Sequence, residues 1–166
     1  YFASDEELAQ LSDSSVGCNS GPNGQSILRD NNYHFKELKI LPGNVGYLKL
    51  NEFADVAMAG PTAIAAMNFL ANADAIIIDL RENHGGEVSM IQLLASYFLK
   101  ESTHLDDFYV RRGDSTVQYW SQVLVSGPSL TETKLYILTS GFSFSAAEEF
   151  AYDLKNLKRA TIVGET

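Results

Sequence analysis

The sequence contains one cysteine, Cys18, so an internal disulfide is excluded. No metal-ligating residues cluster around that thiol, and we expect neither a metal nor another cofactor. The chain also lacks any apolar run close to the roughly 20 residues that a membrane-spanning helix needs, so no membrane span is expected. No signal peptide is visible and the first residue is Tyr1, which leads us to expect that the natural start is missing.

Basic residues are scarce, with 12 Lys and Arg against 21 Asp and Glu, which gives a formal net charge of −9. This acidic balance argues against nucleic acid and anionic membranes as partners, because both carry negative charge themselves. Hydrophobic residues make up 45% of the 166 residues and charged ones 20%, which is enough for a packed core. The length fits one domain or most of one.

The chain divides by composition into two parts. Residues 1–32 are rich in Ser, Asn, Asp and Gly, and this composition predicts a polar loop or connection. Residues 33–166 instead show regular hydrophobic periodicity, in which strand-like and helix-like segments alternate. The pattern predicts an α/β domain with a largely parallel sheet and right-handed crossovers, beginning with a hairpin of residues 34–41 and 45–50. Further strands are expected at residues 75–80, 108–111, 117–125, 135–139 and 160–163, and helices from residues 60, 88 and 146.

Three serines, Ser140, Ser143 and Ser145, lie between a buried strand and a helix. Ser145 with Glu148 three residues later matches a capping box, which is a purely structural interpretation. The functional interpretation is a nucleophile, because unpaired N–H groups at a helix N-terminus stabilise developing negative charge. The local pattern leaves both interpretations open.

The pair Gly85-Gly86 opens a helix after another buried strand. It indicates either a turn that needs positive φ or a bare backbone N–H aimed at a substrate carbonyl oxygen. Asp79 and Arg81, just before it, alternate sides of the strand end and need not pair with each other, so Arg81 is expected to anchor loops.

A serine nucleophile also needs a base, and none in the sequence is convincing. His84 adjoins the glycine pair but is expected to be a loop residue. Lys155 and Lys158 lie roughly 15 and 20 Å beyond Ser145 along one helix, at about 1.5 Å rise per residue. Both are too far away to take its proton.

The segments DLRENHGG and TSGFSFSAAEEFAYDLKNLKRATIVGE resemble the tail-specific, or C-terminal processing, serine peptidases. With LPGNVGYLKLNEF, they are most similar to the branch that includes interphotoreceptor retinoid-binding protein and its bacterial relatives. The resemblance covers residues 33–166 and implies the spiral α/β core of the ClpP and crotonase group. It also implies that Ser145 is the nucleophile, and that Gly85 or Gly86 and the Ala146 N–H form the oxyanion hole.

The same resemblance implies a base that residues 1–166 do not contain. Many family members carry a lysine beyond the Gly-Glu that matches Gly164-Glu165, and the retinoid-binding-like branch carries a histidine upstream of the region where Tyr1 begins. We therefore expect a peptidase core truncated at both ends and inactive alone. It would act on polypeptides near their C-termini, in a periplasmic or secreted location. The oligomeric state is left open.

Two rival functions stay open on the same fold. One is a non-catalytic module that binds an apolar, retinoid-like ligand, with Tyr97, Phe98, Phe142 and Phe144 lining a cavity and the serine kept only as a cap. The other is an acyl-thioester enzyme of crotonase type, which also uses paired N–H groups. The acidic charge and the lack of an evident basic patch for a phosphorylated carrier count against the second.

Overall fold

The computed structural model describes residues 22–165, which belong to two units divided between Asn32 and Tyr33. In the first unit, the described part is helix α2 (Pro22–Asp30), where the sequence predicted a polar loop. Asn31 stabilises the C-terminal end of this helix, because its backbone N–H and its side-chain Nδ2 both donate to Ile27 O at 3.1 Å. Residues 1–21 lie outside the described part.

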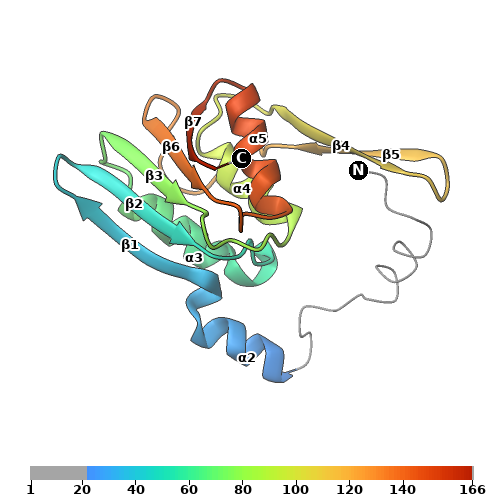
Figure 1. Cartoon of the computed structure of the whole chain (residues 1–166), viewed down its shortest axis with the longest axis horizontal. Coiled ribbons are helices and arrows are strands. Elements are labelled where there is room, and N and C mark those ends of the chain that lie inside the picture. The colour runs from blue at the N-terminus through green and yellow to red at the C-terminus, as the bar shows by residue number, and fades with distance from the viewer. Residues whose placement is uncertain (1–21, 166) are drawn as a thin grey trace. The chain divides into compact units, whose positions relative to one another are not determined.

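The second unit is built on a sheet with strand order β1-β2-β3-β6-β7 (Figure 1). Strands β1 (Phe35–Leu41) and β2 (Val45–Leu50) form an antiparallel hairpin that follows the short 3-10 helix η1 (Asn32–His34). From β2 onward all pairings are parallel, through β3 (Ala75–Asp79), β6 (Lys134–Thr139) and β7 (Ala160–Gly164). The predicted α/β fold with a largely parallel sheet is therefore confirmed.

Helices α3 (Val56–Phe69), α4 (Val88–Ser96) and α5 (Ala146–Asn156) lie in the connections between parallel strands. The predicted start of the first of them at Gly60 was wrong. The helix begins four residues earlier because Asp55 is its N-cap and the Asp55 carboxylate accepts the Ala57 N–H at 2.6 Å. Pro61 is accommodated inside the helix. Within residues 22–165, no helix is both long and apolar enough to cross a membrane.

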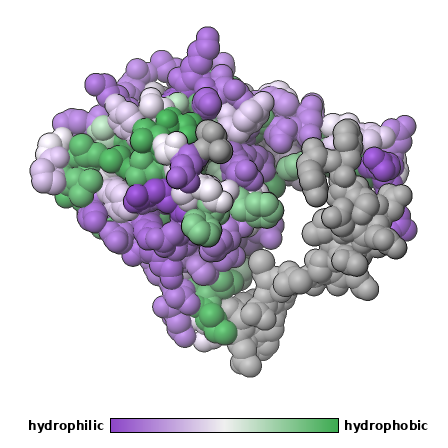
Figure 2. Space-filling view, in the orientation of Figure 1, coloured by the Kyte–Doolittle hydropathy of each residue, from purple (hydrophilic) through white to green (hydrophobic). Residues whose placement is uncertain are grey.

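The core lies on one face of the sheet. The strands contribute Leu48, Ile78 and Ile137, all fully buried, and the helices add Met67, Leu94 and Phe150 to the same cluster. Side chains on the opposite face, such as Tyr47, Ile77 and Leu138, are only half-buried. Figure 2 shows hydrophobic side chains gathered over the middle strands, within a surface that is otherwise mostly hydrophilic.

Strands β4 (His104–Val110) and β5 (Ser115–Trp120) form a separate two-stranded antiparallel sheet between α4 and β6. The sequence predicted this hairpin, but β4 begins four residues earlier and β5 ends five residues earlier than expected. The end of β5 is fixed by the next residue, because Ser121 donates its N–H to Thr103 O at 2.9 Å and accepts the Thr103 N–H at 2.8 Å.

The three segments that carry the predicted motifs leave the sheet at one edge. Strands β2, β3 and β6 are parallel neighbours, so their carboxyl ends coincide. The loops that start after Leu50, Asp79 and Thr139 therefore meet there. This edge of an open α/β sheet is where functional loops gather.

Candidate active site

Two of the three serines anchor the turn between β6 and α5. The Ser143 hydroxyl donates to Leu80 O at 2.8 Å and accepts the Ser140 N–H at 3.0 Å. The Ser140 hydroxyl donates to Arg81 O at 2.5 Å. Both hydroxyls thus tie the serine turn to the loop after β3, and this structural use leaves Ser145 as the candidate nucleophile.

Ser145 is exposed and is the N-cap of α5. Its backbone has φ 55° and ψ −120°, which a non-glycine residue rarely adopts and which costs about 1–3 kcal/mol. The conformation is stabilised by Glu148, whose carboxylate accepts the Ser145 N–H at 2.9 Å, as in the predicted capping box, while the Glu148 N–H donates to the Ser145 carbonyl oxygen at 2.9 Å. A strained, exposed serine between a strand and a helix is also the feature of a nucleophile elbow, although no G-x-S-x-G sequence is present.

The glycine loop lies directly against this serine. A β-carbon placed on Gly85 would lie 2.9 Å from Ser145 Cβ, 3.0 Å from Phe144 O and 3.3 Å from Ala146 N. Gly85 and Gly86 have φ values of +101° and +132°, so both also agree with the alternative that this pair forms a turn that needs positive φ. The fold thus brings Gly85, Ser145 and Ala146 into one small region.

The peptide between Gly85 and Gly86 has a defined orientation. Its carbonyl oxygen, Gly85 O, accepts the Phe53 N–H at 2.7 Å. The two residues are joined by a trans peptide bond, in which C=O and N–H point in opposite directions. The Gly86 N–H is therefore turned away from Phe53.

The two glycine N–H groups are used differently. The Gly85 N–H donates to the Asn83 Oδ1 atom at 2.8 Å. Among residues 22–165, neither the Gly86 N–H nor the Ala146 N–H donates a hydrogen bond. Of the two glycines left open by the sequence, Gly86 is therefore the one with a free donor.

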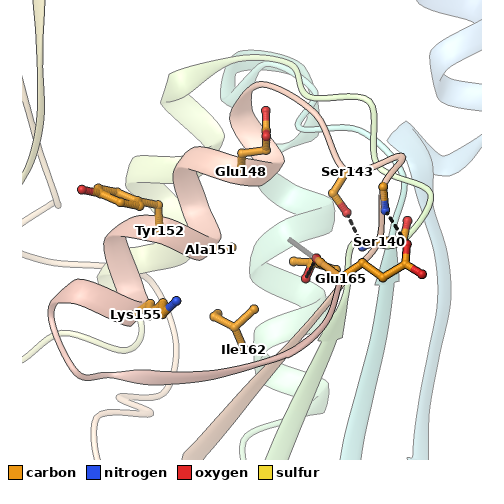
Figure 3. A pocket seen from close by; sticks show the side chains of 10 residues that line it. Ser140, Ser143, Glu148, Ala151, Tyr152, Lys155, Ile162 and Glu165 are labelled. Atoms are coloured by element: carbon orange, nitrogen blue, oxygen red, sulfur yellow. Dashed lines mark hydrogen bonds between the residues drawn. The ribbon is translucent and has the colours of Figure 1, made fainter. Parts of the chain in front are cut away.

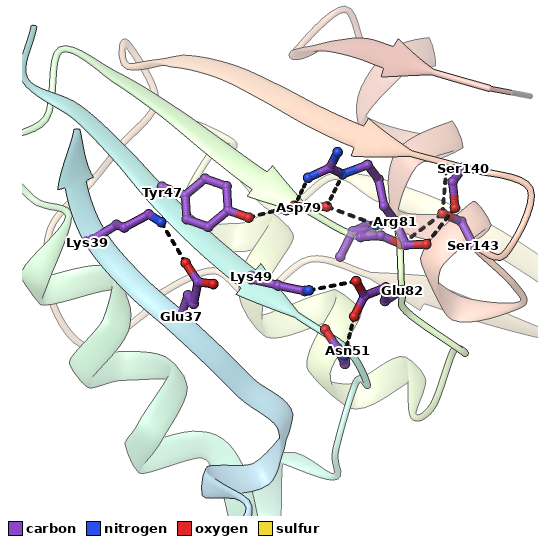
Figure 4. A network of polar contacts seen from close by, with 11 residues as sticks. Glu37, Lys39, Tyr47, Lys49, Asn51, Asp79, Arg81, Glu82, Ser140 and Ser143 are labelled. Atoms are coloured by element: carbon purple, nitrogen blue, oxygen red, sulfur yellow. Dashed lines mark hydrogen bonds and ion pairs between the residues drawn. The ribbon is translucent and has the colours of Figure 1, made fainter. Parts of the chain in front are cut away.

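Sequence reasoning also missed a polar network at the end of β3 (Figure 4). The Asp79 carboxylate is buried and accepts Arg81 Nε at 2.9 Å, Arg81 Nη2 at 2.7 Å and the Tyr47 hydroxyl at 2.6 Å. Asp79 and Arg81 therefore do pair, which the sequence had left open. The expectation that they alternate sides of the strand end was wrong, because residues two apart on a strand share a face.

The network shifts the titration of its members. Burial raises the pKa of Asp79, but the hydrogen bonds from Arg81 and Tyr47 outweigh it and lower that pKa to about 2. Desolvation, followed by the hydrogen bond to Asp79, raises the pKa of Tyr47 to about 12. Since the Arg81 carbonyl accepts from Ser140, this charged network supports the serine turn, as the anchoring role expected of Arg81 requires.

A cavity of about 470 Å³ lies beside the serine turn (Figure 3). Ser140 and Ser143 line one side of it and Lys155 lines the other, with Ile162 between them. Glu148 also lines it, so the cavity adjoins the residue that caps Ser145. Lys155 and the serine turn lie on different sides of this space, in keeping with the expectation that this lysine is not the base.

His84 and two carboxyls of α5, one buried and one half-buried, are the other titratable groups near this region. His84 is exposed, and its backbone N–H donates to Asn51 O at 3.1 Å, as suits a loop residue. On α5, desolvation and, after it, neighbouring carboxylates raise the pKa of Glu149 and of Asp153 to about 7 each. One oxygen of each carboxyl, Glu149 Oε1 and Asp153 Oδ2, is buried and has no hydrogen-bond partner among residues 22–165.

The aromatic side chains expected to line a ligand cavity are separated. Tyr97 and Phe98 are in the core, with 0% and 1% exposure, whereas Phe142 and Phe144 are 75% and 66% exposed. The four residues do not form one pocket, so the alternative of an apolar-ligand module is not favoured.

Comparison with known proteins decides the family. The profile of peptidase family S41 matches residues 44–166, which is most of the chain. This chain belongs to peptidase family S41. It is 32% identical over 123 residues to a carboxyl-terminal-processing protease from Picosynechococcus sp. and 33% identical over 127 residues to one from Synechocystis sp.. These alignments cover 73% and 75% of the chain and 28% of each relative, so the chain spans about a quarter of the length of these relatives.

Solved structures of this family have the same fold. A photosystem II D1 C-terminal processing protease matches with a TM-score of 0.58 and 23% identity, over 76% of this chain and 32% of that chain. A structure from Bacteroides fragilis described as an S41 protease matches with a TM-score of 0.64 and 23% identity, over 79% of this chain and 38% of the other. The S41 family membership also confirms the resemblance to C-terminal processing peptidases found in the sequence.

Proposed function

We propose that this chain is the core of a tail-specific serine endopeptidase, which hydrolyses peptide bonds near polypeptide C-termini. The observation that carries the proposal is the contact between Ser145 and Gly85, in which an exposed hydroxyl residue at a helix start lies against a glycine loop. Membership of peptidase family S41 supplies the reaction class. The photosystem II D1 processing protease and the two cyanobacterial relatives make C-terminal processing the best-supported form of it.

In this proposal Ser145 Oγ attacks the scissile carbonyl carbon. The carbonyl π electrons move to oxygen, and the resulting oxyanion accepts hydrogen bonds from the N–H groups of Gly86 and Ala146. Neither N–H has an acceptor within the described part of the chain, and the second also belongs to the first turn of α5, where the helix dipole favours negative charge. Removing one such donor typically lowers kcat by 10²–10³.

The general base is proposed to come from outside residues 1–166. The carboxylate nearest to Ser145 in the chain is that of Glu148, and it is already engaged by the Ser145 backbone N–H. The intact protein would then need that external group for turnover. We also propose a polypeptide as the substrate, in line with membership of a peptidase family, and a periplasmic or secreted location.

A labelling experiment on the full-length protein tests the nucleophile. A fluorophosphonate probe, mapped by mass spectrometry, should modify Ser145. Ser145→Asn should abolish both labelling and peptidolysis while keeping the fold, because Asn is as good an N-cap as Ser. The matched control is Ser143→Ala, two residues earlier, which should still be labelled. Modification at another serine, or normal turnover by Ser145→Asn, would overturn the assignment.

A further inference from the structure

We propose that Asn83 is a positioning residue that fixes which glycine N–H faces the oxyanion. The inference rests on the proposed peptidase function and adds a residue that none of the sequence motifs assigned. Asn83 is fully buried, with 0% exposure, in the loop between β3 and the glycine pair. Its side chain and its backbone contact three separate segments of the site.

The side-chain amide of Asn83 joins two of these segments. Its Nδ2 donates to Leu50 O, at the end of β2, at 2.9 Å. Its Oδ1 accepts the Gly85 N–H at 2.8 Å, two residues further along, which is the geometry of an Asx turn. A buried amide with both ends bonded has one orientation, since rotating it would place like groups against each other.

The backbone of Asn83 joins the third segment. Its carbonyl accepts the Phe144 N–H at 3.1 Å, from the residue directly before Ser145. The N–H of the same peptide unit belongs to His84, points in the opposite direction and donates to Asn51 O at 3.1 Å. One residue thus sets the spacing between the glycine loop and the serine turn.

These bonds decide the roles of the two glycines. The Gly85 N–H is occupied by Asn83 Oδ1, and the Gly85 carbonyl is occupied by the Phe53 N–H. With both Gly85 groups held, the peptide plane that carries the Gly86 N–H cannot rotate. That donor is therefore fixed on the side away from Phe53 before substrate arrives, as preorganised oxyanion stabilisation requires.

Asn83 itself does not touch the reacting atoms in this scheme. Its loss would let the Gly85–Gly86 peptide reorient, and a misplacement of about 1 Å can cost roughly 10²-fold in rate. Because substrate binding does not depend on that peptide, replacing Asn83 should lower kcat and leave KM nearly unchanged.

The kinetic test uses the full-length protein and three variants. Asn83→Ala removes both side-chain bonds and should lower kcat by about 10–100-fold, with KM changed by less than about two-fold. Asn83→Asp keeps an oxygen that can accept the Gly85 N–H. Its kcat should therefore stay close to that of the wild type, even if its Tm is lower. Asn44→Ala is the matched control, because Asn44 Nδ2 also donates to a carbonyl, that of Asn72, at 2.8 Å, but at the β1–β2 turn. It should lower Tm and leave kcat unchanged.

An exchange measurement tests the geometry without turnover. Within this sequence His84-Gly85 is the only His-Gly pair and Gly85-Gly86 the only Gly-Gly pair, so paired ¹³C-carbonyl and ¹⁵N-glycine labels identify both amides. Gly85 should be protected from hydrogen exchange and Gly86 should not. Asn83→Ala should lower the Gly85 protection at least ten-fold.

The outcomes separate this inference from the proposed function. Wild-type protein that cleaves no peptide would overturn the proposed function, whatever the exchange data show. Wild-type turnover combined with unchanged kcat in Asn83→Ala, or with kcat that simply follows Tm across the three variants, would overturn the role of Asn83 alone. A Gly85 amide that exchanges as fast as Gly86 in the wild type would overturn it as well.

Discussion

Gly85 and Ser145 are packed so closely that a single methyl group on the glycine would lie 2.9 Å from the serine Cβ. That separation is shorter than real Cβ contacts allow, and the neighbouring atoms, Phe144 O and Ala146 N, belong to the backbone. The glycine loop and the start of α5 can therefore approach each other only because position 85 has no side chain.

Gly85→Ala should accordingly damage the site as well as the fold. We expect a loss of unfolding free energy of about 1–3 kcal/mol from positive φ and steric conflict, together with loss of Ser145 labelling in the full-length protein. The matched control is Gly43→Ala, at φ +82° with nothing within 4 Å of the added carbon. This control should lower the unfolding free energy only by the backbone strain, and Ser145 should still be labelled. Equal labelling in both variants would contradict the role of the contact.

Asp153 and Glu149 should make the protein less stable as pH rises. The folded-state pKa of each is raised to about 7. Desolvation is the largest cause for both; Asp106 adds to it for Glu149, and Glu149 and Asp106 add to it for Asp153, where His104 opposes the shift. The folded protein therefore binds more protons than the unfolded chain between about pH 4 and 7, and stability is lost as pH increases through that window.

Asp153→Asn removes one of these carboxyls and should stabilise the protein at pH 8 but not at pH 4. One pKa unit corresponds to about 1.4 kcal/mol, and each kcal/mol shifts Tm by roughly 2–4 °C in a domain of this size. Thermal unfolding at the two pH values measures the difference. Glu101→Gln, at an exposed position, is the matched charge change and should show no such pH dependence. A Tm gain of Asp153→Asn that is the same at both pH values would count against the buried-carboxyl explanation.

Arg81→Met should destabilise the protein strongly, because it leaves the 1% exposed Asp79 carboxylate without its guanidinium partner. Removing the partner of a buried charge costs about 3–5 kcal/mol, and the loss is expected below that range because the Arg81 side chain is itself 56% exposed. In the wild type the pKa of Asp79 is lowered to about 2, so this stabilisation is present above the ordinary pKa near 4 and is lost as pH falls toward 2. Denaturant unfolding at pH 7 and pH 3 tests both statements.

The control for that variant is Lys39→Met, which breaks the exposed Lys39–Glu37 pair. An exposed pair contributes about 0–1 kcal/mol, so this change should be nearly neutral. If the two methionine variants lost similar stability, the Asp79 network would contribute no more than an exposed ion pair.

Ser143→Ala should loosen the serine turn without removing the nucleophile. It deletes the hydrogen bond to Leu80 O and the one from Ser140 N–H, at a cost of about 1–3 kcal/mol for the groups left unpaired. Fluorophosphonate labelling of Ser145 should persist at a reduced rate. Complete loss of labelling in a folded Ser143→Ala protein would instead indicate that Ser143 takes part directly.

The features that the sequence predicted are those with a local signal. Strand and helix periodicity, the Ser145–Glu148 capping box and the β1–β2 hairpin all depend on residues a few positions apart. The start of α3 was missed although Asp55 is a good N-cap, because Gly60-Pro61 gave a stronger apparent start. The resemblance to the C-terminal processing peptidases then predicted that the serine turn and the glycine loop form one site.

What the sequence did not predict depends on partners far along the chain. Asn83 bonds to Leu50, 33 residues earlier, and to Phe144, and no local pattern specifies those contacts. An Asn two residues before a glycine does signal an Asx turn, and this signal would have pointed to Gly85. The burial of Asp153 is likewise set by packing around α5 rather than by its neighbours in sequence.

The serine turn is held by bonds that reach far back along the chain, such as Ser143 to Leu80 across 63 positions and Ser140 to Arg81 across 59. Such contacts exist only after β3 and β6 have paired, so the loops at this edge are ordered late and by the rest of the molecule. A shortened product that stops before β6 would retain the glycine loop and much of the core, yet would have nothing to hold that loop against. The geometry of the site thus depends on the completed sheet. Fluorophosphonate labelling of Ser145 should therefore be lost at a lower denaturant concentration than the helical circular dichroism signal.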